Sequence, residues 1–290
     1  MIELSRIAEM RGWSRARRAE GRRVGFVPTM GSLHAGHLQL VDRARTSADL
    51  VVMSIFVNPT QFGPDEDLAR YPRDLPRDRV RATGRHVDCL FVPAVSAMYP
   101  RPGLITIQPG ALGEHLCGPR RPGHFAGVLT VVAKLLHIVE PDVAVFGRKD
   151  AQQALLIRRM VADLDLPVRV DVAPTVRETD GLAMSSRNAY LSAEERRAAA
   201  GLPRALAAGH EQFQRGAREA NAIIAAVGAV LASEPGVAIE YIEAVHQETL
   251  APVADVDAAT LLAVAVQVGG TRLIDNIVLG DGLAGDVVGE

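Results

Sequence analysis

The chain has 290 residues, of which 48% are hydrophobic and 23% charged, proportions that exclude a disordered or collagen-like protein. Its formal net charge of −2 provides no global basic field for nucleic acid or membranes, and its two cysteines are too few for a disulfide framework. The charged N-terminus has no signal-peptide core, and no stretch is apolar enough to span a membrane. We therefore expect a cytoplasmic, two-domain protein that binds neither nucleic acid nor membrane.

The first half of the chain alternates short apolar runs with segments of helical period. Strands are predicted at residues 23–28, 49–58, 87–93, 142–146 and 168–174, with a further short strand at 105–109. Helices are predicted at residues 3–20, 38–48, 75–84, 127–139 and 152–164, and a polar loop at 59–75. This alternation favours a Rossmann-like, doubly wound parallel sheet, an α/β fold, over residues 1–175.

The pattern changes after residue 175. Residues 192–233 are alanine-rich and helical, and Ser192 begins a capping-box sequence. Strands are predicted at residues 237–245, 261–268 and 271–279, and residues 280–290 are expected to form a frayed tail. We predict that residues 176–290 form a second, smaller α+β domain with an antiparallel sheet.

The segment PTMGSLHAGH (28–37) follows the first predicted strand of the sheet and begins a helix. Ligands bind at this position in open α/β sheets, and the N–H groups of a helix N-terminus suit phosphate. His34 and His37 lie three residues apart, so their side chains share one face of the first turn. Gly31 and Gly36 would allow a close approach of phosphate oxygens. A metal site and ordinary surface histidines are the alternatives, although no third ligand lies nearby in the sequence.

The chain retains lysine at only two positions, Lys134 and Lys149, and all its other basic residues besides histidine are arginines. In such a chain a lysine indicates a need for a compact ammonium group. Lys149 lies in FGRKDAQQ (146–153), which also joins a predicted strand to a helix, with Asp150 as a candidate N-cap. A solvated lysine remains the alternative for both positions, more so for Lys134, which lies within a helix.

Three further segments carry polar groups suited to ligands. FVNPTQF (56–62) places Asn58 and Gln61 after a predicted strand, where a carboxylate or hydroxyl could bind. MSSRN (184–188) combines hydroxyls with a guanidinium on a loop expected to be mobile, which suits a phosphate clamp, although an ordinary loop is an alternative. RRPGHF (120–125) forms a basic turn, and a metal site there would lack ligands beyond Cys117 and His124.

Together these segments resemble the pantothenate synthetase (pantoate–β-alanine ligase) family over nearly the whole chain. Six motifs occur in the order of that family: PTMGSLHAGH, FVNPTQF, EDLARYPRDL, RRPGHFAGV, FGRKDAQQ and MSSRN. The segment TRLIDN near the C-terminus is also typical of the family. The HxGH element alone would indicate only the wider nucleotidylyltransferase group, in whose class I aminoacyl-tRNA synthetases a KMSKS loop takes the place of MSSRN.

The resemblance implies a two-step reaction. The pantoate carboxylate attacks the α-phosphorus of ATP, which gives pantoyl adenylate and pyrophosphate, and β-alanine then attacks the acyl carbonyl to give pantothenate and AMP. It also implies Mg²⁺ with the triphosphate, a Rossmann-type domain followed by a smaller lid domain, and a cytoplasmic homodimer.

The resemblance also implies roles for individual residues. His37, His34, Lys149, Ser185 and Arg187 would be catalytic, with His37 as proton donor. The residues expected to bind ATP are Met30, Gly31, Ser32, Leu33, His34, Ala35, Gly36, His37, Gly147, Arg148, Lys149, Asp150, Val176, Met184, Ser185, Ser186 and Arg187. Those expected at the pantoate and β-alanine site are Gln61, Gln153, Asn58, Arg121, His124 and Tyr71, with Gln61 and Gln153 in direct contact with pantoate. No direct metal ligand is implied.

The chain departs from the family at two positions. Arg148 stands where glutamate is common, and Ala151 replaces a common aromatic residue, so any role of a glutamate there is in doubt. Two other functions remain open: an adenylyltransferase whose nucleotidylated product is final, and a nucleotide-sensing module without catalysis. The first would not explain Gln61, Gln153 or a second acceptor.

Overall fold

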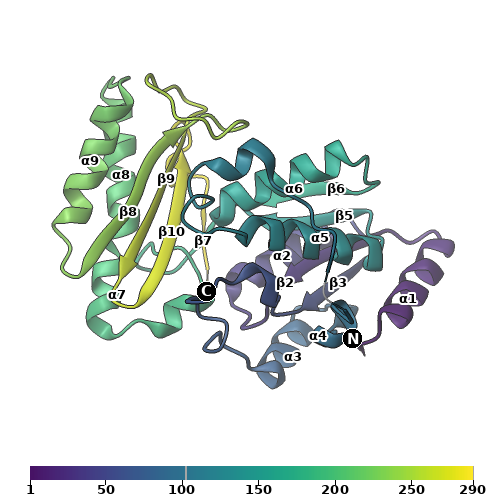
Figure 1. Ribbon diagram of the computed structural model, residues 1–290. Helices are drawn as coiled ribbons and strands as arrows, with labels where there is room; N and C mark the ends of the chain where they lie inside the picture. The colour runs from purple at the N-terminus through teal and green to yellow at the C-terminus, as the bar shows by residue number, and fades with distance from the viewer. Residues whose placement is uncertain (102, 290) are drawn as a thin grey trace. The chain divides into compact units, whose positions relative to one another are not determined.

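The computed structural model describes residues 1–101 and 103–289, which form two compact units (Figure 1). The first unit comprises Met1–Gly113, Cys117–Arg148 and Gln153–Ala173. The second comprises Glu114–Leu116, Lys149–Gln152 and the chain from Pro174 onward. No helix among the described residues combines the length and apolar character that a membrane span requires.

The first unit is built on a six-stranded parallel sheet with helices on both faces (Figure 1). The strand order is β1-β4-β3-β2-β5-β6. The strands are β1 (Ile2–Leu4), β2 (Val24–Thr29), β3 (Leu50–Ile55), β4 (Cys89–Phe91), β5 (Val143–Gly147) and β6 (Arg169–Ala173). The predicted α/β fold with a doubly wound parallel sheet is therefore confirmed.

Four of the five helices predicted in the first half of the chain are present with bounds within three residues of those expected. The helices are α1 (Ile7–Ala19), α2 (Ala35–Arg45), α3 (Leu75–Gly84), α4 (Val95–Met98), α5 (His124–Val139) and α6 (Ala151–Asp163), with 3₁₀ turns η1 (Pro59–Gln61), η2 (Gly110–Glu114) and η3 (Arg148–Asp150). The short helix α4 was not predicted, and α6 begins in the Lys149–Gln152 segment of the second unit. The buried residues of α5 and of the central strands are mostly apolar, as expected where a parallel sheet is covered on both faces.

Two predictions in this unit were wrong. Residues 105–109 form no strand, and the side chains of Leu104 and Ile105 are 97% and 88% exposed. The backbone N–H of Ile107 instead donates to the Thr130 hydroxyl on α5, so an apolar run was mistaken for a strand although it has no strand to pair with. In addition, the helix predicted at 3–20 begins only at Ile7, because β1 pairs with β4 along the edge of the sheet.

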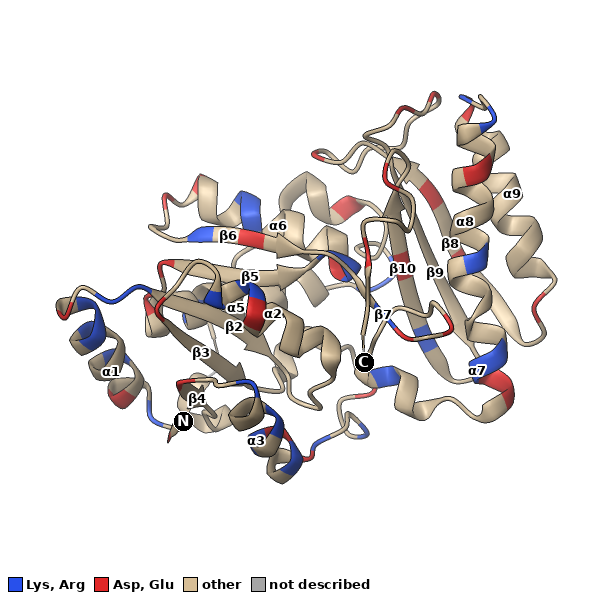
Figure 2. Cartoon of the chain, turned by 180° about the vertical axis from the view of Figure 1, so that it is seen from behind, with Lys and Arg blue, Asp and Glu red and all other residues tan. Residues whose placement is uncertain are grey.

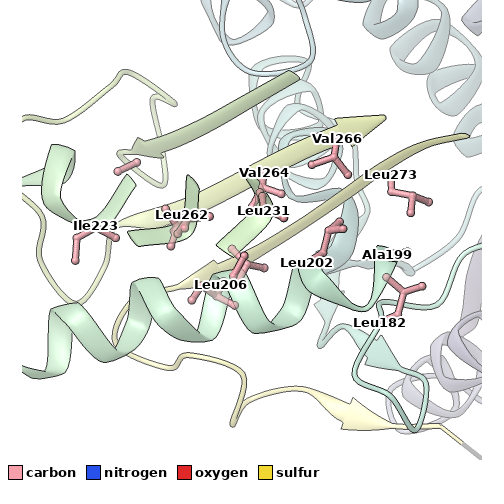
Figure 3. Close-up of a cluster of buried hydrophobic side chains, with 14 of the residues drawn as sticks. Leu182, Ala199, Leu202, Leu206, Ile223, Leu231, Leu262, Val264, Val266 and Leu273 are labelled. Atoms are coloured by element: carbon pink, nitrogen blue, oxygen red, sulfur yellow. The ribbon is translucent and has the colours of Figure 1, made fainter. Parts of the chain in front are cut away.

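The second unit contains a three-stranded antiparallel sheet, as predicted, and its strand order is β10-β9-β8. Its elements are β7 (Val176–Arg177), η4 (Ser186–Tyr190), α7 (Ala193–Ala199), α8 (Gly201–Gln214), α9 (Ala220–Ala232), β8 (Val237–Val245), β9 (Leu261–Val268), β10 (Thr271–Val278) and β11 (Val287–Val288). Ser192 caps α7 with its hydroxyl, which accepts from the backbone N–H of Glu195. Figure 3 shows Leu202 and Leu206 of α8 among Ile223, Leu231, Leu262 and Val264 in the core of this unit.

The C-terminal tail is ordered against β7, so the prediction of a frayed tail was also wrong. Strand β11 pairs in parallel with β7. Arg177 donates to both carboxylate oxygens of Asp275 (2.6 and 3.0 Å) and to Asp286 (2.7 Å), and the three side chains are almost fully buried. Burial alone would lower the pKa of Arg177, but the two carboxylates outweigh it and raise that pKa. The glycine-rich sequence around Asp286 gives no sign of this ion pair, because Arg177 lies over a hundred positions earlier in the chain.

Figure 2 shows basic and acidic residues interspersed over both units. Many form ion pairs at the surface, for example Arg15 with Glu140 (2.6 Å) and Arg43 with Asp171 (2.8 Å). Each guanidinium in these pairs is therefore largely balanced locally by a carboxylate. Such pairing is expected in a chain whose basic and acidic residues are nearly equal in number.

Candidate active site

The first unit's sheet has a topological switch point between β2 and β5. From β2 the chain continues to β3 and β4 on one side, whereas from β5 it continues to β6 on the other. The segment with His34 and His37 follows the end of β2, while Gly147 is the last residue of β5 and Arg148 follows it. Ligands of open α/β sheets bind at such carboxyl ends, so this edge is the candidate active site.

The loop between β2 and α2 is held by a buried carboxylate. Asp78 of α3 is 2% exposed and accepts the backbone N–H groups of Ser32 (2.8 Å) and Leu33 (2.7 Å). Gly31 has a φ of 83°, and a Cβ there would lie 2.9 Å from Asp78 Oδ2. Burial raises the pKa of Asp78, and the two N–H groups only partly offset that effect. Besides the approach of phosphate oxygens expected from the sequence, the absence of a side chain at Gly31 thus leaves room for the Asp78 carboxylate.

Sequence reasoning missed Asp78. A single acidic residue in a strongly charged helix resembles a solvent-exposed one, and α3 has only two buried positions, Asp78 and Ala82. The available signal was weak: Asp78 lies four residues from Ala82, on the same face of the helix.

His34 and His37 are in contact with each other, as their spacing predicted. His34 is the N-cap residue of α2, and the two ring centroids lie 4.0 Å apart with an angle of 36° between the planes. The backbone N–H of His34 donates to Nδ1 of His37 at 3.4 Å. A neutral His37 that accepts there carries its proton on Nε2, which is the nitrogen able to donate to a ligand.

Gln61 is 9% exposed and is the last residue of η1, three positions after Asn58, which caps that turn. Its Nε2 donates to the sulfur of Met30 at 3.1 Å, and its Oε1 accepts from Asn58 Nδ2 at 3.1 Å. The amide therefore lies beside the β2–α2 loop. Asn58 is 1% exposed, and its Nδ2 also donates to the carbonyl of Gly127 (3.2 Å). Both Asn58 amide hydrogens are thus used within the protein, which suits the supporting role expected for it.

Arg121 and His124 also support Gln61. The Nδ1 of His124 lies 2.8 Å from the carbonyl oxygen of Gln61, and Arg121 Nη1 lies 2.9 Å from His124 Nε2. Because a carbonyl only accepts and a guanidinium only donates, His124 is neutral with its proton on Nδ1. Arg121 also forms a two-pronged ion pair with Glu66 (2.7 and 2.6 Å). Burial opposes ionisation of Glu66, but Arg121 outweighs it and lowers the pKa of that carboxyl.

Tyr71 and Gln153 are also predicted site residues of the first unit. Tyr71 is 5% exposed and contacts Phe62 edge to face, with ring centroids 5.9 Å apart. Gln153 lies partly buried in the first turn of α6, which follows β5 through η3. Sequence reasoning singled out neither Glu66 nor Phe62 as a functional residue. Glu66 could not be distinguished from the other acidic residues of the loop at 59–75 before its partner Arg121 was known.

Several predicted ATP-binding residues belong to the second unit. The backbone carbonyl of Lys149 accepts from Asn276 Nδ2 at 2.8 Å, and Asn276 is part of the TRLIDN segment. The hydroxyl of Ser185 caps η4 by accepting the N–H of Arg187 (3.2 Å), and Met184 N–H donates to the carbonyl of Val176 (2.9 Å). The convergence of Lys149 and Met184–Arg187 with the histidines of the first unit stays a prediction.

Within residues 1–101 and 103–289, no group of three or more histidine, cysteine or acidic side chains is arranged to hold a metal ion. Magnesium usually keeps several waters and binds through one or two carboxylates together with substrate phosphates. The expectation of Mg²⁺ with the triphosphate stays a prediction.

Comparisons with known proteins agree with this geometry. The family model described as "Pantoate-beta-alanine ligase" matches residues 3–278. A pantothenate synthetase from Moorella thermoacetica is 53% identical, with 95% of this chain and 98% of the relative covered. The crystal structure of the pantothenate synthetase from Thermus thermophilus matches with a TM-score of 0.91 at 48% identity, over 96% of this chain and 99% of that one.

A third relative was solved with ligands. The pantoate-beta-alanine ligase from Francisella tularensis, described as complexed with β,γ-ATP and β-alanine, has a TM-score of 0.77 at 32% identity. The match covers 97% of this chain and 98% of the relative. The chain therefore belongs to the pantoate-beta-alanine ligase family, a family of enzymes.

Proposed function

We propose that the protein condenses pantoate with β-alanine to pantothenate in two steps through pantoyl adenylate, with ATP converted to AMP and pyrophosphate. The observation that carries this proposal is the contact of His34 and His37 at the N-terminus of α2, beside the switch point of the sheet. The names of the relatives support the overall condensation, and the ligands named for the Francisella structure support ATP and β-alanine as substrates.

In the first step a pantoate carboxylate oxygen attacks the α-phosphorus of ATP, and the bond to the bridging oxygen of pyrophosphate breaks. Negative charge then grows on the phosphoryl oxygens and on the leaving pyrophosphate. The N–H groups of α2, the Nε2–H of His37 and the ring of His34 donate to these oxygens, while the Lys149 ammonium compensates their charge. Fixed donors of this kind are each worth roughly 10²–10³ in rate.

Pantoate is held by Gln61 and Gln153. The side chain of Gln61 has its oxygen occupied by Asn58, so its Nε2 is the group that meets a pantoate oxygen. The Arg121–His124 pair keeps the Gln61 backbone in place, and Tyr71 shields the pantoate site. This supports a site in which the position of the carboxylate relative to the α-phosphorus is set before reaction.

In the second step the neutral amine of β-alanine attacks the acyl carbonyl, the carbonyl–phosphate bond breaks, and AMP leaves with the bonding electrons. The amine loses a proton as the amide forms. No covalent intermediate with the enzyme is needed, because ATP supplies the activation. Water must be excluded from the acyl adenylate, and the loop at 59–75 and the segment 180–190 are the candidate lids.

Magnesium would accompany ATP, and when bound it would neutralise charge on the phosphates. We further propose that residues 1–175 bind ATP and pantoate, that residues 176–290 act as the lid domain, and that the protein works as a cytoplasmic homodimer. Sedimentation of the purified protein near 62 kDa, twice the chain mass of 31.0 kDa, would support the dimer, and sedimentation at the chain mass would contradict it.

Isotope transfer tests the proposed route directly. Pantoate labelled with ¹⁸O in its carboxylate is incubated with MgATP and β-alanine, and the products are analysed by mass spectrometry. The adenylate route transfers one ¹⁸O to the phosphate of AMP. Label in inorganic phosphate would instead indicate an acyl phosphate and overturn the proposal.

The same experiment separates the alternative functions. Without β-alanine, pantoate-dependent release of pyrophosphate and a bound pantoyl adenylate are expected. A released nucleotidylated product that is inert to β-alanine would favour an adenylyltransferase. ATP binding without turnover would favour a sensing module. Pyrophosphate release that is independent of pantoate would contradict the ligase reaction.

A further inference from the structure

Two backbone groups fix the orientation of the Asn58 side chain. The N–H of Thr60 can only donate and lies 3.4 Å from Asn58 Oδ1, whereas the carbonyl of Gly127 can only accept and lies 3.2 Å from Nδ2. The Thr60 hydroxyl adds a second donor to Oδ1 at 3.0 Å. If the Asn58 amide were flipped, its NH₂ group would face the N–H of Thr60 and its oxygen would face the carbonyl of Gly127. Neither pair could form a hydrogen bond, so only one orientation is favourable.

The orientation of Asn58 in turn fixes that of Gln61. Because Asn58 presents Nδ2 to Gln61, the atom of Gln61 that it meets at 3.1 Å must be the acceptor Oε1. The other end of the amide, Nε2, then lies beside the sulfur of Met30, which is a weak acceptor. Gln61 is therefore held with its Nε2 toward Met30, where an acceptor stronger than a thioether could take the place of the sulfur.

Tyr99 provides the shortest hydrogen bond to the Asn58 side chain. Its hydroxyl donates to Asn58 Oδ1 at 2.8 Å. Its ring has two neighbours, with the Phe56 ring at 6.2 Å and the Lys134 ammonium at 5.4 Å from its centroid. Burial raises the pKa of Tyr99, so the hydroxyl keeps the proton that it donates. Lys134 of α5, one of the two lysines of the chain, thus has a specific contact with the Tyr99 ring.

We infer that Tyr99 is a positioning residue for pantoate, which acts through Asn58 to hold the Gln61 amide with Nε2 toward the substrate. This inference rests on the proposed function, because it takes Gln61 as a pantoate contact. Pantoate offers carboxylate and hydroxyl oxygens, and its carboxylate only accepts hydrogen bonds. A Gln61 amide turned by 180° would present Oε1 to that carboxylate and repel it. The relay from Tyr99 through Asn58 therefore favours a carboxylate ligand over its amide analogue.

The test removes only the hydroxyl, with Tyr99→Phe. Dissociation constants for pantoate and for its carboxamide analogue are measured by isothermal titration calorimetry, together with the KM for ATP. We expect pantoate binding to weaken roughly three- to tenfold, the factor for one neutral hydrogen bond. The preference for pantoate over the carboxamide should fall, while the KM for ATP and the melting temperature stay near their wild-type values. Tyr241→Phe, which removes the hydroxyl of a buried tyrosine on β8, is the matched control and should bind pantoate as the wild type does.

A double-mutant cycle shows whether Tyr99 acts through Gln61. In a Gln61→Ala background, Tyr99→Phe should have no further effect on the pantoate dissociation constant. Additive effects, or wild-type affinity and preference in Tyr99→Phe, would overturn the inference while leaving the ligase reaction intact. A wild-type protein without pantoate-dependent turnover would overturn the proposed function, and this inference with it.

Discussion

The glycine at position 127 allows helix α5 to approach η1 so closely that a methyl group has no room. A Cβ on Gly127 would lie 2.3 Å from the carbonyl oxygen of Thr60 and 2.8 Å from the Cα of Gln61. Ordinary contacts begin near 3.4 Å, so Gly127→Ala must displace η1 by about 1 Å. Overpacking of this kind costs about 1–3 kcal/mol, and an error of about 1 Å in positioning costs about 10²-fold in rate. We therefore expect a fall in kcat/KM for pantoate of roughly a hundredfold and a melting temperature lower by a few degrees.

Gly228 on α9 provides a matched control, since it is also a helical glycine. A Cβ there would lie 3.5 Å from Ile242 Cδ1, which is an ordinary contact. Gly228→Ala should leave the kinetics unchanged and stabilise the protein by about 0.4–1 kcal/mol. Steady-state assays with varied pantoate and thermal unfolding measure both effects. Wild-type kinetics in Gly127→Ala would refute the claim that the position of η1 controls pantoate binding.

Three further substitutions test the site. His37→Ala should lower the rate of pyrophosphate release roughly 10²–10³-fold with little change in melting temperature, and normal turnover would refute its role. Lys149→Arg should raise the KM for ATP, because a planar fork replaces a compact charge, and unchanged kinetics would show that the scarcity of lysine is uninformative. Glu66→Gln removes the charge of a carboxyl whose pKa is lowered by Arg121, although burial opposes its ionisation. The ionised carboxyl therefore contributes to stability above pH 4.5, and this contribution is lost as the pH falls through the pKa of Glu66 in the folded protein. Urea unfolding should therefore find the variant less stable than the wild type at pH 7, with the difference closing below pH 4.5, and a difference independent of pH would contradict this.

The elements predicted from the sequence are those whose signal is local. A buried parallel sheet is predicted by two short apolar runs, at Leu50–Ile55 and at Val24–Thr29. In the structure these runs are neighbouring parallel strands. The contact of His34 with His37 follows equally from their spacing at the start of a helix. Local periodicity was therefore sufficient for five of the six strands of the sheet, all but β1, and for the pair of histidines in the candidate site.

The parts that could not be predicted depend on pairs that are distant in sequence. Asp78 lies 46 and 45 positions from Ser32 and Leu33, whose N–H groups it accepts, and Tyr99 lies 41 positions from Asn58. A charged or aromatic residue carries no mark in the sequence that identifies such a partner. The buried pairing of Asp286 with a distant arginine, in a tail expected to fray, has the same cause.

The exposed run at Leu104 and Ile105 illustrates the opposite error. An apolar run forms a strand only where a neighbouring strand has free backbone groups to pair with it. In the structure the backbone N–H of Ile107 instead donates to the Thr130 side chain of α5. Such a segment cannot be distinguished from an edge strand by its composition alone.

The central claim is that His34, His37 and Lys149 act on the triphosphate of one ATP molecule. A crystal structure of the protein with a non-hydrolysable ATP analogue and pantoate tests it most directly. We predict His37 Nε2 and the Lys149 ammonium at hydrogen-bond distance, about 2.7–3.2 Å, from phosphate oxygens of the same nucleotide, with Gln61 Nε2 on a pantoate oxygen. A nucleotide whose phosphates contact the lysine but neither histidine, or the reverse, would contradict the account.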